Sequence, residues 1–397
     1  MKKFTVLLEI IFIILIFSLS ANSQDSLASP YDEKVVQNYL KKFGTKSLVI
    51  GVIKDGVQSV KGYGKINTWG KKNITPDGNT LFEIGSITKV FTTLILADLV
   101  KKDSIQLNEP IINLLPKKDY SYSKSLNKIT ILNLATHTSG LPRVTNRSIN
   151  GILWARSFPP LAIHALLFGF FNPYRNYDTT KLFKDLRHIN LENKVGSKFS
   201  YSNFGMTTLG YILTNKSNLN FDNLLTKTVF DTLKMDKTFL NLPKSEYDNF
   251  ADGHNKYGLK TPRWTFENNM QGLGAINSTV YDLMKFLEVN LDGHKNSYLH
   301  NLLEYCQITR YKISEKRNIG LAWIKSNSES TSNQEIVWHN GGTGGFRSFL
   351  GFNKETKIGI VILSNSAKDV DKLAVDILKM MMKDKVIETQ LKPISKK

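Results

Sequence analysis

The chain contains few of the residues that cross-link a protein or hold a metal. Only one of its 397 residues is cysteine, Cys306, so an internal disulfide is excluded. The seven histidines show no His-x-x-x-His or His-x-His spacing, so we expect no zinc site. No motif indicates a bound cofactor. The fold must therefore depend on its hydrophobic core, which a chain of this length can build, with Cys306 as a buried apolar residue.

Acidic residues are also scarce. The chain has 34 of them against 53 basic residues, which gives a formal net charge of +19. Such a balance favours acidic partners. Nucleic acid is not expected, because no recognised binding motif and no basic–aromatic stripe accompanies the charge. An anionic surface of the cell envelope remains as a partner, and a merely solvated lysine-rich surface is the alternative.

Apolar runs of membrane-spanning length are missing as well. Residues 10–19 and Leu161–Phe171 are apolar, but each run is shorter than the roughly 18 residues that a span needs, so no stable membrane anchor is expected. The first run follows Lys2-Lys3 and precedes Ala21-Asn22-Ser23, an order typical of a cleaved signal peptide over residues 1–23. We therefore expect a periplasmic or secreted protein. The second run is open to three interpretations: core packing, a pocket wall or lid, or membrane contact.

Short β-branched runs lie near both ends of the chain. Leu48–Ile53 and Val57–Tyr63 flank Lys54-Asp55-Gly56 and predict a β-hairpin. Arg347–Phe352 and Lys357–Leu363 predict a second hairpin. Because helical patterns fill the middle of the chain, we expect one sheet assembled from the two termini with a large helical insertion.

The predicted fold class is therefore α/β (α+β), with a mixed, mainly antiparallel sheet flanked by helices. We expect one catalytic domain over residues 34–390. Its α/β subdomain would comprise residues 34–80 and 271–385, and its helical subdomain residues 81–270.

Two helices are expected to hold chemically active residues. The segment after Ser86 is apolar on nearly every face, which is typical of a buried helix. Such a helix would hold its first turn rigidly. A second helix is predicted from about Phe204 to Thr214, with Tyr201 and Asn203 in the loop before it.

Three short motifs contain groups suited to nucleophilic catalysis. In Ser86-Ile-Thr-Lys89 the serine and the lysine are three residues apart, which places both side chains on one face of a helix. Tyr201-Ser-Asn203 adds a phenol and an amide, and His339-Asn-Gly341 adds an imidazole beside glycine. Together they can supply a nucleophile, a base and an oxyanion site.

These motifs and their surroundings resemble the serine β-lactamase and penicillin-binding protein superfamily. The branch is that of class C β-lactamase-related serine hydrolases, which includes D-alanyl-D-alanine carboxypeptidases and esterases. The resemblance runs from about Leu48 to about Met382. The segments that strengthen it are Leu81–Ser86, Leu134–Pro142, Gly196–Gly205, Gly274–Thr279 and Trp338–Gly342. The predicted architecture is also the one that this resemblance implies.

The chain departs from class C β-lactamases at one motif. Those enzymes carry Lys-Thr-Gly where this chain has His339-Asn340-Gly341, and His-x-Gly is similar to the esterase and peptidase-like members. With an ordinary pKa of about 6.5, His339 would be mostly neutral at pH 7 and would titrate near that value. It would attract the carboxylate of a β-lactam or a D-alanyl peptide less than lysine does, which favours ester or unusual amide substrates.

Ser86 is the expected nucleophile, forming an acyl-enzyme. Lys89 could accept its proton only if the pKa of the amine is depressed from about 10.4. Tyr201 is the other candidate base, as a phenolate beside a cationic Lys89. The resemblance favours Tyr201, aided by Lys89, with the same tyrosine later protonating the leaving group.

Asn203 and His339 are expected to support this pair. The amide of Asn203 can donate to a substrate carbonyl and accept from Lys89, or it can cap the following helix. His339 is expected to hydrogen-bond Tyr201 and to tune its pKa.

Glycine beside His339 is expected to shape the substrate site. Gly341 and Gly342 permit close approach of the backbone to a substrate, and Thr343 follows them. The resemblance maps the oxyanion hole onto the backbone N–H groups of Ser86 and Gly342.

Competing motifs fail in detail. The glycine-rich run Gly341–Gly345 lacks the following Lys-Ser/Thr of a phosphate-binding loop. No Gly-x-Ser-x-Gly surrounds Ser86, which argues against an α/β-hydrolase. His137 is interpreted as a structural histidine at a helix end.

The function expected from these observations is serine hydrolysis of a small molecule through an acyl-enzyme. The substrate would be a β-lactam or a related amide first, and an ester or a D-alanyl peptide as the alternatives. A non-catalytic protein that binds peptidoglycan or penicillin is a more distant alternative.

Overall fold

The structure, a computed structural model, describes residues 29–117, 121–145, 172, 174–291, 297–327 and 335–391. The predicted signal peptide over residues 1–23 and the apolar run Leu161–Phe171 lie outside the described residues. Within the described ranges, no helix is long and apolar enough to cross a membrane.

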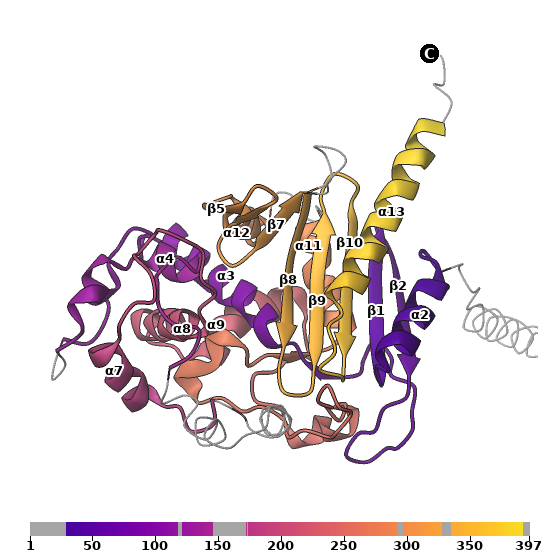
Figure 1. Ribbon diagram of the computed structural model, residues 1–397, viewed down its shortest axis with the longest axis horizontal. Helices are drawn as coiled ribbons and strands as arrows, with labels where there is room; N and C mark the ends of the chain where they lie inside the picture. Colours follow the sequence, from indigo (N-terminus) through magenta and orange to yellow (C-terminus); the bar gives the residue numbers. More distant parts are fainter. Residues whose placement is uncertain are drawn as a thin grey trace, which may run out of the picture.

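An eight-stranded sheet forms the centre of the molecule, in the order β2-β1-β10-β9-β8-β7-β6-β5 (Figure 1). Its strands are β1 (Ser47–Lys54), β2 (Val57–Gly64), β5 (Tyr311–Ser314), β6 (Arg317–Ile319), β7 (Ile324–Asn327), β8 (Glu335–Gly342), β9 (Arg347–Asn353) and β10 (Ile358–Ser364). β1 pairs antiparallel with β10, opposing Val49 to Leu363, so the two ends of the chain meet in one sheet. The predicted fold class is confirmed. β3 (Phe82–Glu83) and β4 (Asn277–Ser278) pair separately.

The two predicted hairpins are present. Asp55 and Gly56 have φ of 54° and 78°, so they form the two-residue turn between β1 and β2 that suits the twist of the strands. In the second hairpin, Lys357 was expected in the strand. It has φ of 55° and belongs to the turn, since β10 begins at Ile358.

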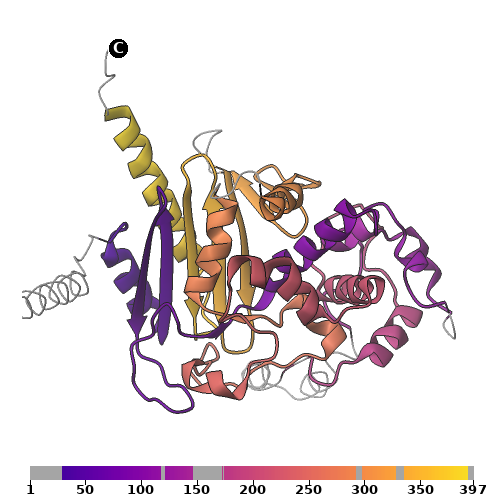
Figure 2. The ribbon, with the colours of Figure 1, turned by 180° about the vertical axis from the view of Figure 1, so that it is seen from behind.

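Helices cover both faces of the sheet. α2 (Glu33–Phe43) and α13 (Asp371–Leu391) lie on one face, and α11 (Val280–Asn290) lies on the other (Figures 1 and 2). Successive side chains of β1 point to opposite faces of the sheet and contribute to both cores. Ile50 packs in the core with α13, and Val49 packs in the core with α11. At Gly51 an added Cβ would lie 2.3 Å from Met284 Sδ, so glycine permits α11 to pack closely.

The remaining helices come mainly from the middle of the chain. The α-helices are α3 (Thr88–Lys101), α4 (Ile131–Ala135), α7 (Thr179–His188), α8 (Asn203–Ser217), α9 (Phe221–Leu225), α10 (Asp231–Leu233) and α12 (Tyr298–Gln307). The 3-10 helices are η1 (Gly85–Ile87), η2 (Ile111–Asn113), η3 (Lys124–Lys128), η6 (Lys244–Asn249) and η7 (Asn268–Leu273), and η5 (Thr226–Phe230) is a π-helix.

α3 runs through the core, as its apolar pattern predicts. Its residues are buried from Thr88 to Leu99. Polar side chains on it are satisfied inside the protein: Thr92 Oγ1 donates to the carbonyl of Gly272 at 2.6 Å. A helix enclosed on all sides has little freedom to move, so the turn at its N-terminus is held in place.

Cys306 is buried, as predicted from its apolar character. Its Sγ donates to the carbonyl of Thr93 at 3.3 Å. Burial raises the pKa of the thiol to about 12, so Cys306 is not a thiolate at neutral pH.

Candidate functional site

Ser86 and Lys89 lie together at the start of α3. Ser86 is in the 3-10 turn Gly85–Ile87, and Lys89 Nζ is 2.9 Å from its Oγ. The same Nζ donates to the carbonyl of Leu273 at 2.5 Å. Burial, and then the nearby Arg143, lower the pKa of Lys89 well below its usual value. Burial therefore favours the uncharged form of the amine beside the Ser86 hydroxyl.

Two glycines bring β8 against the turn Gly85–Ile87 that contains Ser86. Gly85 has φ of +51°, and a Cβ there would lie 2.7 Å from the backbone N of Gly342. At Gly341, a Cβ would lie 2.0 Å from the carbonyl oxygen of Ile84. Ser348 of β9 donates to that same Ile84 carbonyl at 2.7 Å. Any side chain at either glycine would push the strand away from Ser86.

The ladder between β8 and β9 determines where the Gly342 N–H points. Thr343 N donates to Phe346 O at 3.1 Å, and Gly342 is opposite Arg347 in the next pair. Hydrogen-bonded and non-hydrogen-bonded pairs alternate in an antiparallel ladder, so the Gly342 N–H points away from β9. It therefore faces the edge of β8 that approaches Gly85.

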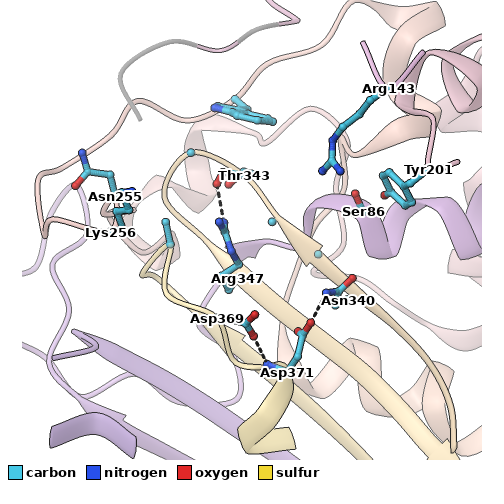
Figure 3. Close-up of a pocket in the computed structure, with 15 residues that line it drawn as sticks. Ser86, Arg143, Tyr201, Asn255, Lys256, Asn340, Thr343, Arg347, Asp369 and Asp371 are labelled. Carbon is cyan, nitrogen blue, oxygen red and sulfur yellow. Dashed lines mark hydrogen bonds between the residues drawn. The ribbon is translucent and has the colours of Figure 1, made fainter. Parts of the chain in front are cut away.

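Tyr201 faces Ser86 across the site (Figure 3). Lys89 Nζ and Arg143 Cζ each lie 5.1 Å from the centre of its ring. Burial raises the pKa of the phenol to about 12, with the Ser86 hydroxyl and Arg143 acting in the opposite direction. The resting tyrosine is therefore a protonated phenol, not the phenolate that a cationic Lys89 was expected to stabilise.

His137, which the sequence suggested was structural, lies against Tyr201. It follows α4, as expected for a helix end, but its ring centroid is 4.5 Å from that of Tyr201. Its φ is +56°, unusual for a residue with a side chain. Nδ1 accepts from Ser202 N at 3.3 Å, and Nε2 is buried without a partner among the described residues. Burial, then Lys89, lowers the pKa of His137 well below its usual value.

Asn203 does not fill one of its two predicted roles, that of the helix cap. The cap of α8 is Ser202, whose Oγ accepts from Gly205 N at 2.8 Å, so the capping alternative for Asn203 is wrong. Its Nδ2 donates to the Tyr174 hydroxyl at 2.8 Å, whereas the hydrogen bonds that Lys89 makes among the described residues go elsewhere. Its Oδ1 is buried and unpartnered within the described chain.

His339 is buried on β8 and uncharged. Its Nδ1 lies 2.6 Å from the backbone oxygen of Asn340, so Nδ1 carries the proton and Nε2 is an acceptor. Burial, and then Lys89, lower its pKa to about 3. The expected titration near pH 6.5 is therefore wrong, whereas the expected neutral imidazole agrees with this environment. The predicted hydrogen bond to Tyr201 is not among the contacts of His339 that the described chain shows.

A pocket of about 670 Å³ opens onto Ser86 (Figure 3). The three predicted substrate-contacting residues, Gly341, Gly342 and Thr343, all line it. The lining residues that the sequence did not indicate include Arg143, Trp264, Lys256, Arg347, Asp369 and Asp371, together with Asn340 as a lining side chain. Of these, only Arg143 gave a usable signal, because it directly follows the segment that ends at Pro142.

Comparisons with known proteins agree with the geometry. A family model described as Beta-lactamase matches residues 33–380. The chain is 23% identical over 385 residues to a Beta-lactamase of Lysobacter lactamgenus, covering 89% of this chain and 91% of the relative. It is 24% identical over 333 residues to a Beta-lactamase of Escherichia coli (strain K12), covering 75% of this chain and 80% of the relative.

Solved structures show the shared fold. The D-alanine carboxypeptidase AmpC from Burkholderia cenocepacia superposes with a TM-score of 0.72 at 21% identity, covering 89% of this chain and 97% of that one. A class C beta-lactamase in complex with cefoxitin superposes with a TM-score of 0.72 at 20% identity, covering 88% of this chain and 97% of that one.

Proposed function

The chain belongs to the beta-lactamase family of serine hydrolases, and from this premise we propose that it hydrolyses a β-lactam or related amide through an acyl-enzyme on Ser86. The observation that carries the proposal is the 2.9 Å contact between Ser86 Oγ and an enclosed Lys89 amine. A serine hydroxyl becomes a strong nucleophile only when a neighbour can take its proton, and a neutral amine can do so.

Proton transfer is proposed to begin at Lys89. The amine accepts the proton of Ser86 as Oγ attacks the carbonyl carbon. We propose that the Tyr201 phenol, protonated at rest, gives its proton to the leaving nitrogen and becomes a phenolate, which then takes a proton from the attacking water. The proton held by Lys89 returns to Ser86 Oγ as the acyl-enzyme is hydrolysed. Burial supports this division, since it lowers the pKa of Lys89 and raises that of Tyr201.

The backbone N–H groups of Ser86 and Gly342 are proposed to bind the oxyanion. The approach of Gly85 to Gly342 supports this, because it brings β8 beside the nucleophile turn. Fixed donors of this kind stabilise the charge that develops on the carbonyl oxygen. Asn203 Oδ1 and His339 Nε2 are proposed to accept hydrogen bonds from Lys89, Tyr201 or the substrate once it binds.

Ester hydrolysis by the same acyl-enzyme is the second candidate, favoured by the uncharged His339. A D-alanyl peptide is a further substrate of the same chemistry. We also propose that the N-terminal segment over residues 1–23 directs export and that the basic protein contacts an anionic surface of the cell envelope. The division into an α/β subdomain (residues 34–80 and 271–385) and a helical subdomain (residues 81–270) is a further proposal.

The test uses purified protein with nitrocefin, p-nitrophenyl acetate and a D-Ala-D-Ala peptide. Ser86→Ala should abolish turnover and covalent labelling by penicillin or fluorophosphonate probes, a loss of roughly 10⁶-fold where a serine hydrolase has been measured. Ser104→Ala, beyond the other end of α3, is the matched control and should keep wild-type rates. Labelling of the alanine variant at the wild-type level would contradict the assignment. Labelling of the wild type without any turnover would instead support the non-catalytic penicillin-binding alternative.

A further inference from the structure

One end of the pocket is charged by residues that the proposed chemistry does not use. Asp371, the first residue of α13, lines the pocket there together with Asp369 and Arg347 (Figure 3). Asn340 Nδ2 donates to the Asp371 carboxylate. This end of the pocket is where β8, β9 and α13 meet, and we refer to these four residues as the α13 corner.

The sheet directs these side chains toward α13. Neighbouring residues of a strand point to opposite faces, so Asn340 and His339 of β8 are on opposite sides of the sheet. Arg347, opposite Gly342, crosses over that glycine, where a Cβ would lie 2.8 Å from its Nη1. Nη1 donates to the carbonyls of Thr343 at 2.9 Å and Phe346 at 2.8 Å, so the guanidinium is held in place.

A guanidinium, an amide N–H and the N-terminus of a helix would together attract an anion. In this protein the Asp371 carboxylate is already the anion at this position, because it accepts a hydrogen bond from the amide of Asn340. Asp369 adds a second carboxylate, whose Oδ1 accepts from the N–H of Asp371 at 2.7 Å. Two carboxylates therefore face one guanidinium. A substrate anion would have to approach this negative charge.

We propose that Asp371 is a specificity-determining residue, which disfavours substrates that carry a carboxylate toward the α13 corner and favours their neutral counterparts. The proposal rests on the proposed function, because it concerns the substrate of the same pocket. Arg143, which lies near Ser86 and Tyr201 (Figure 3), leaves room for an anionic group at the other end of the pocket.

Protonation of Asp371 should weaken the discrimination. Burial, and then Asp369, raise the pKa of Asp371 to about 6, with Asn340, Arg347 and Arg317 acting in the opposite direction. Above that pH the carboxylate is charged and repels an anionic substrate. As the pH falls through about 6, the charge is lost and the penalty on the anionic substrate should fall with it.

The experiment compares nitrocefin with its methyl ester, which differ only in the carboxylate. In Asp371→Asn, which can still accept from Asn340, the ratio of kcat/KM for the free acid over the ester should rise about fivefold to tenfold. Asp376→Asn, on an exposed turn of the same helix, is the matched control and should leave the ratio unchanged. In the wild type the ratio should also rise between pH 8 and pH 5, which tests the proposal even if the variant fails to fold.

The inference would be overturned if the kcat/KM ratio were unchanged in Asp371→Asn, or if the ratio in the wild type did not depend on pH. Turnover of the ester in the same experiment would still support the proposed function. Failure of the wild type to turn over either compound, or p-nitrophenyl acetate, would overturn the proposed function and this inference with it.

Discussion

The two ends of the pocket treat charge in opposite ways. Around Ser86, the ionisable groups Lys89, His137 and His339 are enclosed, and burial lowers the pKa of each. In the α13 corner, Asp369 is exposed, and the Asp371 carboxylate, whose pKa burial raises only to about 6, is charged at neutral pH. The comparison teaches that burial favours the uncharged forms that proton transfer needs, whereas a carboxylate that stays charged at neutral pH affects which substrates approach.

The largest effect is expected from breaking the enclosed pair. Lys89→Ala and Tyr201→Phe should each lower the rate of acylation by at least about 10³-fold. Because the two groups share one proton path, the double variant should be barely slower than either single one. Single-turnover acylation by nitrocefin measures this, and multiplicative losses would show that the groups act separately.

Glu83 is a buried carboxyl group beside Trp264, a residue that lines the pocket. Its Oε1 accepts from Trp264 N at 2.6 Å, and burial raises its pKa to about 7, with Thr343, the Trp264 N–H and Arg263 opposing. A carboxyl whose folded pKa exceeds its unfolded one stabilises the protein below the unfolded value and loses that contribution as the pH rises through about 7.

Glu83→Gln should therefore make the free energy of unfolding less dependent on pH. The wild type should lose roughly 3 kcal/mol at most between pH 4.5 and pH 7.5, and the variant should not, so this loss should appear as the difference between the two proteins. Urea unfolding at both pH values measures it. Parallel pH profiles for the two proteins would mean that Glu83 is ionised in the folded state.

Substitutions of His137 test whether its ring is needed to position Tyr201. His137→Ala removes the ring that packs on Tyr201 at 4.5 Å, and we expect kcat to fall about tenfold to a hundredfold with little change in KM. His137→Asn is the matched variant, because asparagine tolerates the positive φ. If His137→Asn were as stable as the wild type but kept the low kcat of His137→Ala, the imidazole ring itself would be needed for activity. If His137→Asn had the kcat of the wild type, the role of His137 would be only to adopt the positive φ.

The smallest effect is expected at His339. His339→Lys adds an amine to an enclosed site near Lys89, where burial favours the uncharged form. The kcat/KM ratio of nitrocefin over its methyl ester should therefore rise by no more than about threefold, less than for Asp371→Asn. A larger, salt-sensitive rise would show that a charge survives at this position and would remove the contrast between the two ends of the pocket.

Much of the fold could be predicted from local patterns. Asp55-Gly56 between two β-branched runs predicted the first hairpin, and the apolar segment after Ser86 predicted a buried helix. The strands β5 to β7 were not predicted, because they are short and mostly half-exposed, with no continuous apolar run. Such strands are recognisable mainly through their pairing partners.

Spacing predicted contacts of the site only between residues that are neighbours in sequence, whereas Tyr201 and His339 were assigned to it through the family resemblance. Ser86 and Lys89 share one helical face, so their contact follows from spacing. The packing of His137 on Tyr201, and the bond from Asn340 to Asp371, join segments distant in the chain. No local pattern in a single sequence records such pairs.

The sequence by itself determined the pairing of Ser86 with Lys89 on one helical face and the strands of the two hairpins, because each depends on local conformation or periodicity. Only the tertiary structure decided the pKa shifts of Lys89, Tyr201 and His339, since a pKa depends on burial and on charges brought from other segments. It also decided that the carboxylate of Asp371 lies in the pocket, because α13 reaches that wall only when the two ends of the chain meet in one sheet.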